Sequence, residues 1–246
     1  MILRTEGLTK RFGGFTALNG VTVGFQAGAL TGVIGPNGAG KSTFFNLLTG
    51  AVAPSAGRIW WEGREITAVP QHRYAAMGIA KSFQITNVFP QLTALENVRT
   101  AAQALVSRYD PWRPRTRLVA LVEQSNALLA TVGLLHRAGT LAGTLAHGEQ
   151  RALELAMALA ARPRLLLLDE PTAGMSPEET RDVMDLILRL AQERTVILVE
   201  HKMRLVMGVC QRLLVLHQGA LLAEGTPDDI RANDEVKRVY LGQRAH

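Results

Sequence analysis

The sequence predicts an α/β protein with a parallel sheet and a helical insertion, and three observations support this. Residues 30–34 read as a strand that ends in a glycine-rich loop, and a helix follows the loop. Residues 165–168 are all leucine and residues 195–199 are apolar after Thr195, which is typical of parallel strands buried on both faces. Residues 86–163 are rich in Ala, Leu and Gln, with few turn signals.

The elements before the insertion are short and are separated by glycine-containing turns. Strands are expected at residues 3–8, 21–25, 30–34 and 58–61. The helix expected at 42–49 has an apolar face and ends at Gly50, a residue type that often follows a helix.

The insertion has helical spacing at 118–132 and at 150–161. We therefore expect a single domain over 1–246, with a core of residues 1–85 and 164–246 and a helical subdomain over about 86–163. Ligands of open parallel sheets bind beyond the carboxyl ends of the strands, so the functional residues are expected there.

The elements after the insertion carry clear helix and turn signals. Ser176, Pro177 and Glu179 form a cap, a first helical position and a capping-box partner, so a helix is expected between the two apolar strands. Residues 213–222, interrupted by Gln218 and Gly219, predict a hairpin. Residues 226–229 are expected to open a small terminal helix.

Composition places the chain among globular proteins. It has 246 residues, 47% hydrophobic and 20% charged, which excludes disordered, collagen-like and disulfide-rich classes. Cys210 is the single cysteine, so no intrachain disulfide is expected, and there is no Cys/His cluster for a zinc ribbon. No apolar leader and no run of about 18 uncharged apolar residues is visible, so neither export nor a membrane span is expected. The expected compartment is a reducing cytoplasm.

The chain is basic, with a net charge of +6 and a pI near 10. Nucleic acid, an anionic membrane surface and an anionic ligand would all suit this balance. The net charge alone does not distinguish among these three kinds of partner.

The glycine-rich loop matches the phosphate-binding motif G-x-x-x-x-G-K-S at every specified position. Its backbone N–H groups would surround phosphate oxygens, Lys41 would neutralise β- and γ-phosphate charge, and Ser42 would offer its hydroxyl to Mg²⁺. The loop therefore predicts a nucleotide site. Its expected contacts are Gly35, Pro36, Asn37, Gly38, Ala39, Gly40, Lys41, Ser42 and Thr43.

Two carboxylates, Asp169 and Glu170, follow the four-leucine strand. Phosphoryl transfer needs a metal ligand and a group that polarises the attacking water. We expect Asp169 to hold Mg²⁺ through water and Glu170 to act on the attacking water.

With these motifs in this order, the chain resembles the ATPase subunits of ATP-binding cassette (ABC) transporters over essentially its whole length. The resemblance implies a P-loop NTPase, an ABC-type nucleotide-binding domain with a RecA-like core, an antiparallel β subdomain and an inserted helical subdomain. It implies ATP and Mg²⁺ as cofactors. It also implies that an aromatic ring stacks on adenine. Phe12 lies at the matching position, and Phe15 is the alternative. The other interpretation of Phe12 is that it packs in the core.

Two more residues match the family's motifs. Gln84, in Ser82-Phe83-Gln84, matches the Q-loop glutamine, which senses Mg²⁺ and the attacking water. His201 follows the last buried strand and matches the switch histidine that touches the γ-phosphate. The implied catalytic residues are Lys41, Gln84, Glu170 and His201, and the implied metal ligands are Ser42, Gln84 and Asp169.

The family's signature motif, Leu-Ser-Gly-Gly-Gln, stands here as Leu-Ala-His-Gly-Glu at residues 145–149, which we call the signature segment. Ala146 lacks the hydroxyl that the family's serine gives to the γ-phosphate on the partner subunit. The Gly148 N–H and its helix N-terminus could still meet that phosphate. The D-loop also departs, with Ser176 where an aspartate is typical.

The segments 146–151, 173–175, 107–117 and 239–242 resemble those of LivG-like subunits, which serve importers of branched-chain and other hydrophobic amino acids. Relatives for urea, short amides or aromatic acids look similar. The resemblance implies an ATP-hydrolysing motor, peripheral on the cytoplasmic face of the inner membrane. Its implied partners are two transmembrane permeases, a second ABC ATPase subunit and, indirectly, a substrate-binding protein. A different cassette is favoured as the second subunit over another copy of this chain, and no nucleic acid partner is expected.

Other functions are weighed against this one. A soluble ABC ATPase of DNA repair, translation or iron–sulfur assembly would suit the positive charge, but no coiled-coil insertion or duplicated cassette is visible. A GTPase would need an Asn-Lys-x-Asp motif, which is missing, and for a GTPase or a small-molecule kinase Gln84, Gly148 and His201 would have no purpose. A further cluster of arginines and aromatics reads as a solvated loop beside the permease, or as a headgroup or nucleic-acid patch. The cluster comprises Arg108, Tyr109, Trp112, Arg113, Arg115 and Arg117.

Overall fold

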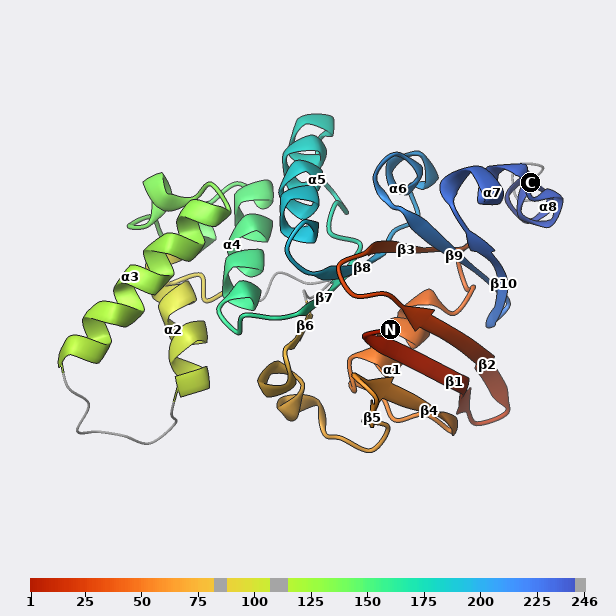
Figure 1. Cartoon of the computed structure of the whole chain (residues 1–246). Coiled ribbons are helices and arrows are strands. Elements are labelled where there is room, and N and C mark those ends of the chain that lie inside the picture. The colour runs from red at the N-terminus through yellow and green to blue at the C-terminus, as the bar shows by residue number, and fades with distance from the viewer. Residues whose placement is uncertain (82–87, 107–114, 242–246) are drawn as a thin grey trace. The chain divides into compact units, whose positions relative to one another are not determined.

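The computed structural model describes residues 1–81, 88–106 and 115–241, and the chain divides into two compact units (Figure 1). The first unit comprises Met1–Tyr74, Leu165–Glu170 and Ala191–His246, and the second comprises Ala75–Arg164 and Pro171–Leu190. Among the described residues, no helix is both long enough and apolar enough to cross a lipid bilayer.

The first unit contains an antiparallel sheet with the strand order β2-β1-β4-β5. Its strands are β1 (Leu3–Phe12), β2 (Phe15–Phe25), β4 (Ala56–Trp61) and β5 (Arg64–Glu65). β1 and β2 form a hairpin that turns at Gly13 and Gly14, so both strands extend beyond the predicted ranges. The sequence pattern misses the extension because register shifts and exposed residues interrupt the alternation near the turn.

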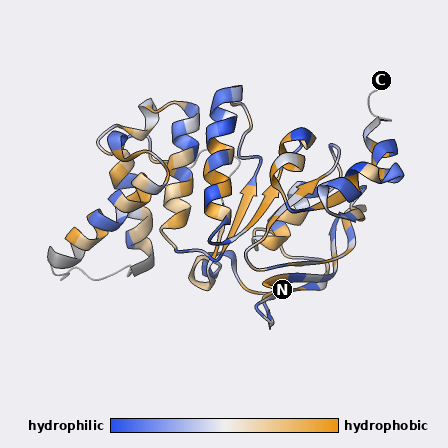
Figure 2. Cartoon of the chain, turned by 45° about the horizontal axis from the view of Figure 1, so that its top comes forward, coloured by the Kyte–Doolittle hydropathy of each residue, from blue (hydrophilic) through white to orange (hydrophobic). Residues whose placement is uncertain are grey.

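The same unit contains the predicted sheet, with the strand order β10-β9-β3-β8-β7, in which all neighbours are parallel except β10 and β9. Its strands are β3 (Leu30–Ile34), β7 (Leu165–Asp169), β8 (Thr195–Val199), β9 (Arg212–His217) and β10 (Ala220–Gly225). β7, β8, β3 and β9 are parallel neighbours, and every residue of β3, β7 and β8 is buried. Apolar residues along this sheet are orange in Figure 2. The uniformly apolar runs are therefore central strands, as predicted.

Helix α1 (Lys41–Leu48) contacts β2 of the antiparallel sheet and β7 and β8 of the parallel one. It buries Phe44, Phe45, Leu47 and Leu48, and Gly50, at φ 67°, follows its end. The predicted terminal helix is two helices, α7 (Pro227–Ala232) and α8 (Asp234–Leu241). Asn233 separates them, because its side-chain oxygen accepts the N–H groups of Glu235 and Val236 and so caps α8.

Helix α6 (Met203–Val209) ends at Cys210, which is buried. The position of a Cβ built on Gly32 of β3 would lie 3.0 Å from the Cys210 Sγ, so the thiol packs directly against the sheet. Burial raises the pKa of the Cys210 thiol to about 12.

The second unit is mainly helical. Its elements are β6 (Ile79–Lys81), α2 (Ala94–Val106), α3 (Arg115–Thr131), α4 (His147–Leu159) and most of α5 (Pro177–Ala191). α2 packs on α3 and α4 around Ala102, Leu121 and Ala160. Thr93 and Glu96 form a capping box that begins α2. The helices expected at 118–132 and 150–161 are α3 and α4.

The second unit has wider bounds than the helical subdomain expected over about 86–163. It begins at Ala75, and it takes in α5. Two hydrogen bonds show why: the Arg164 N–H donates to the Gly78 carbonyl at 2.8 Å, and the Gly148 N–H at the start of α4 donates to Glu179 of α5 at 3.1 Å. Both join segments that are distant in sequence, which periodicity alone does not reveal.

Candidate nucleotide site

The phosphate-binding loop joins β3 to α1 in the first unit, as the sequence predicts. A Cβ built on Gly35 would lie 2.3 Å from the Leu216 carbonyl oxygen, so the backbone at Gly35 leaves no room for a side chain. Gly40 has φ 97°, a left-handed conformation that favours glycine. Asn37 and Gly38, at the tip, are exposed. The sequence thus folds into a tight backbone loop with an accessible tip.

Lys41 begins α1 and is almost fully buried. Its Nζ donates hydrogen bonds to the carbonyls of Gly35 and Pro36, at 2.7 and 3.0 Å. Desolvation lowers the pKa of Lys41, while the charges of Glu170 and Asp169 act in the opposite direction. The ammonium therefore lies over the loop and within the field of both predicted carboxylates. Ser42, the next residue, is exposed.

The carboxylates lie at the carboxyl end of β7. Asp169 is buried and pairs in register with Val199 of β8. Glu170 has φ 46°, a strained conformation for a residue other than glycine, and its N–H donates to the Val199 carbonyl at 2.8 Å. His201 follows β8, and its Nδ1 lies 3.5 Å from the Glu170 Oε1. Neighbouring parallel strands thus bring Glu170 and His201 together.

Phe12 and Phe15 face each other across the β1–β2 turn. Their exposed fractions are 51% and 67%, so neither ring is buried in the core. The Lys10 ammonium lies 5.0 Å from the centre of the Phe12 ring, a cation–π contact. Both rings keep area for stacking on a base.

Several predicted residues lie outside the described part of the chain. Gln84 is one of them, and so are four residues of the arginine-rich cluster: Arg108, Tyr109, Trp112 and Arg113. Arg115 and Arg117 belong to the first turn of α3.

The signature segment lies in the second unit, where Ala146 is the exposed N-cap of α4. Glu149 accepts the Ala146 N–H at 3.0 Å and pairs with the guanidinium of Arg137, also at 3.0 Å. The Gly148 N–H, expected to face a phosphate, donates to Glu179 Oε1 at 3.1 Å. From the sequence, Glu179 was expected only as a capping residue of its own helix. Nothing in the local pattern links positions 31 residues apart.

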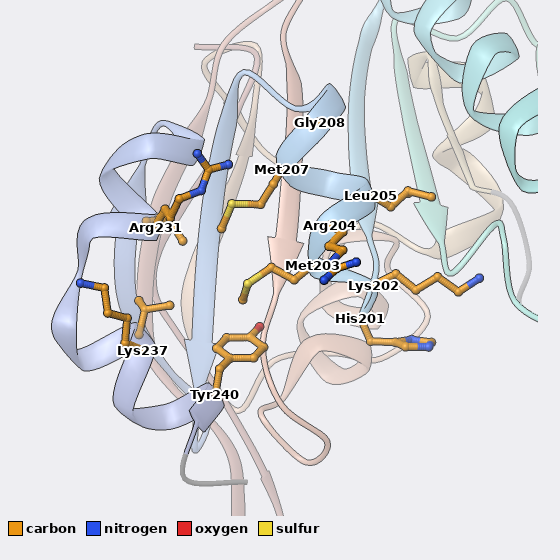
Figure 3. Close-up of a pocket in the computed structure, with 12 residues that line it drawn as sticks. His201, Lys202, Met203, Arg204, Leu205, Met207, Gly208, Arg231, Lys237 and Tyr240 are labelled. Atoms are coloured by element: carbon orange, nitrogen blue, oxygen red, sulfur yellow. The ribbon is translucent and has the colours of Figure 1, made fainter. Parts of the chain in front are cut away.

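A cavity of about 930 Å³ begins at His201 and extends between α6 and the two terminal helices of the first unit (Figure 3). In Figure 3, Met203, Met207 and Tyr240 point into this space. Burial raises the pKa of Tyr240 to about 12. The sequence did not indicate the cavity, because α6 and α8 are too short for periodicity to place their apolar faces.

Comparisons with known proteins agree with this geometry. The family model "ABC transporter" matches residues 18–173, and the model "Branched-chain amino acid ATP-binding cassette transporter" matches residues 220–246. The chain is 42% identical to the high-affinity branched-chain amino acid transport ATP-binding protein BraF of Pseudomonas aeruginosa, and the match covers 98% of each chain. It is 39% identical to LivG of Escherichia coli, which carries the same description, again over 98% of each chain.

Among solved structures, the ADP conformation of MJ1267, an ATP-binding cassette of an ABC transporter, superposes with a TM-score of 0.87 at 31% identity. That match covers 98% of both chains. These full-length similarities indicate the same family as the phosphate-binding loop and the carboxylates at the end of β7. The chain belongs to the ABC transporter family, as one of its ATP-binding subunits.

Proposed function

We propose that this chain is the ATP-hydrolysing motor of an importer for branched-chain or related hydrophobic or aromatic amino acids. The contact of Glu170 with His201 beside Lys41 is the observation that supports hydrolysis. The match of residues 220–246 to the branched-chain model, together with the names of BraF and LivG, supports the cargo.

The residues of the first unit divide the work on ATP. Phe12, or Phe15, stacks on adenine, and the loop N–H groups surround the phosphates. Lys41 moves its ammonium from the carbonyls of Gly35 and Pro36 to the β- and γ-phosphate oxygens. Glu170 accepts a hydrogen bond and then a proton from the attacking water, and His201 contacts the γ-phosphate.

Mg²⁺ fits this site only together with the nucleotide. The described residues contain no group of three or more His, Cys, Asp or Glu side chains placed to hold a metal ion. Mg²⁺ binds through few protein oxygens and completes its shell with phosphates and water. We assign Asp169 and Ser42 as the described ligands, with Gln84 as the third, and the ion neutralises phosphate charge when bound.

We propose that two ATPase subunits associate head to tail, so that Ala146 and Gly148 of one complete the nucleotide site of the other. The second subunit is a different cassette, or else a second copy of this chain. The pair drives two transmembrane permeases that receive cargo from a substrate-binding protein. The subunit then lies on the cytoplasmic face of the inner membrane as a peripheral protein.

Reconstitution into lipid vesicles tests this proposal. The chain is combined with a candidate permease pair, a second cassette subunit and a substrate-binding protein, and uptake of leucine, phenylalanine and urea is compared with and without ATP. We expect ATP-dependent leucine uptake that is lost in Glu170→Gln. Robust ATP hydrolysis by a chain that never co-purifies with membrane proteins would instead favour a soluble ABC ATPase.

A further inference from the structure

Glu179 of α5 makes three hydrogen bonds at the start of two helices in the second unit. Its Oε2 accepts the Ser176 N–H at 3.0 Å, and its own N–H donates to the Ser176 Oγ at 3.2 Å, which caps α5. Its Oε1 accepts the Gly148 N–H at the start of α4, at 3.1 Å. One carboxylate therefore joins the D-loop to the signature segment.

The contact with Gly148 is close, and the carboxylate occupies the face of that glycine. A Cβ built on Gly148 would lie 3.2 Å from both the Cγ and the Oε1 of Glu179. Hydrogen bonds from the Ser176 N–H and then from the Gly148 N–H, with a smaller contribution from the charge of His147, lower the pKa of Glu179. The group is thus an anion at neutral pH, held where the signature segment offers an N–H donor.

We propose that Glu179 is a positioning residue: it holds the Gly148 N–H while no partner nucleotide is present and must release it before the signature segment can take the partner's phosphate. This inference rests on the head-to-tail arrangement of the proposed function. The exclusion follows from chemistry, because a single N–H donor cannot serve two anions at full strength and the two anions repel each other.

The structure leaves Glu179 room to withdraw. A cavity of about 500 Å³ within the second unit is lined by Ala146, Gly148 and Glu179, among others. Rotation of the side chain can therefore free the Gly148 N–H without moving either helix. Because the same carboxylate caps α5 through Ser176, its withdrawal also loosens the D-loop. Engagement of the signature segment and release of the D-loop are then one event.

Glu179→Gln tests the exchange, made in a Glu170→Gln chain that retains bound ATP. Its matched control is Glu178→Gln. This change removes the same charge from the neighbouring residue, whose side chain is exposed. Sedimentation equilibrium with MgATP and with MgADP gives the dimer dissociation constant of each chain. Since bonds to a charged acceptor are about twice as strong as neutral ones, we expect Glu179→Gln to tighten the MgATP dimer about fivefold relative to Glu178→Gln. No tightening is expected with MgADP.

Ser176→Ala shows whether a loosened α5 alone has the same effect, because it removes the cap hydroxyl and keeps Glu179. The inference would be overturned if Glu179→Gln and Glu178→Gln gave equal dimer dissociation constants with MgATP, or if Ser176→Ala tightened the dimer as much as Glu179→Gln. Either result would leave the proposed function standing. Nucleotide binding is measured on the same samples. A chain that binds MgATP but forms no dimer in any variant, either alone or mixed with the second cassette subunit, rejects the head-to-tail arrangement and this inference together.

Discussion

Replacing Glu170 with Gln should separate ATP binding from ATP hydrolysis. The amide has nearly the shape of the carboxylate, so the hydrogen bond from the residue 170 N–H to the Val199 carbonyl and the strained backbone at φ 46° can persist. What disappears is the group that accepts a proton from water. A positioned general base contributes about 10²–10⁴-fold to a rate, so turnover should fall about a hundredfold or more, a barrier increase of about 3 kcal/mol or more.

ATP binding should survive the same change. Glu170 contributes a favourable charge to Lys41, yet a carboxylate near the phosphates also repels them, so its loss does not weaken binding of the anion. The measurements are steady-state phosphate release and equilibrium binding of a fluorescent ATP analogue. Phosphate release within a few-fold of the unmodified chain would remove Glu170 from the proton-accepting role. A large loss of binding would show that the carboxylate acts on the fold of the loop.

Three further substitutions probe other parts of the site. Lys41→Ala should weaken nucleotide binding itself, measured by titration calorimetry, because it removes the cation placed on the loop; unchanged affinity would contradict that role. Phe12→Ala should weaken ATP binding by about 1 kcal/mol, the scale of one aromatic stack. GTP should compete with ATP, because it binds through the same phosphates. If only Phe15→Ala weakens ATP binding, the stacking ring is Phe15. Isolated chains should be mainly monomeric and dimerise weakly with MgATP, and Ala146→Ser should strengthen the dimer, because a hydroxyl bond to a charged phosphate contributes about 1.5–3 kcal/mol. Tight dimers of the Ala146 chain in sedimentation, unchanged by serine, would show that the backbone N–H of the signature segment suffices.

The parallel sheet was predictable because its sequence signal is local. The strands expected at residues 30–34 and 195–199 match β3 and β8 to the residue. The phosphate-binding loop was predictable for the same reason, since all residues of the motif are consecutive in the sequence. Order along the chain also placed Glu170 and His201 directly after two buried strands, although the pairing of those strands and the 3.5 Å separation require the structure.

Other features depend on contacts between distant segments and on side chains that a pattern cannot place. The left-handed conformation of Glu170 has no sequence signal, because glycine is the residue expected there. Asn233 was not recognised as a cap, so α7 and α8 were predicted as one helix. Glu179 shows the limit most clearly, since its hydrogen bond to the Gly148 N–H depends on how α4 and α5 pack.

The burial of Cys210 has a practical consequence for measuring motion in this subunit. A thiol reacts with maleimides as the thiolate, and a thiol whose pKa is raised to about 12 is almost entirely protonated at neutral pH. Its packing against β3 also keeps reagents away. The natural chain should therefore stay unlabelled under native conditions. A cysteine introduced at an exposed position can carry a fluorophore or spin label selectively, without first removing the native thiol.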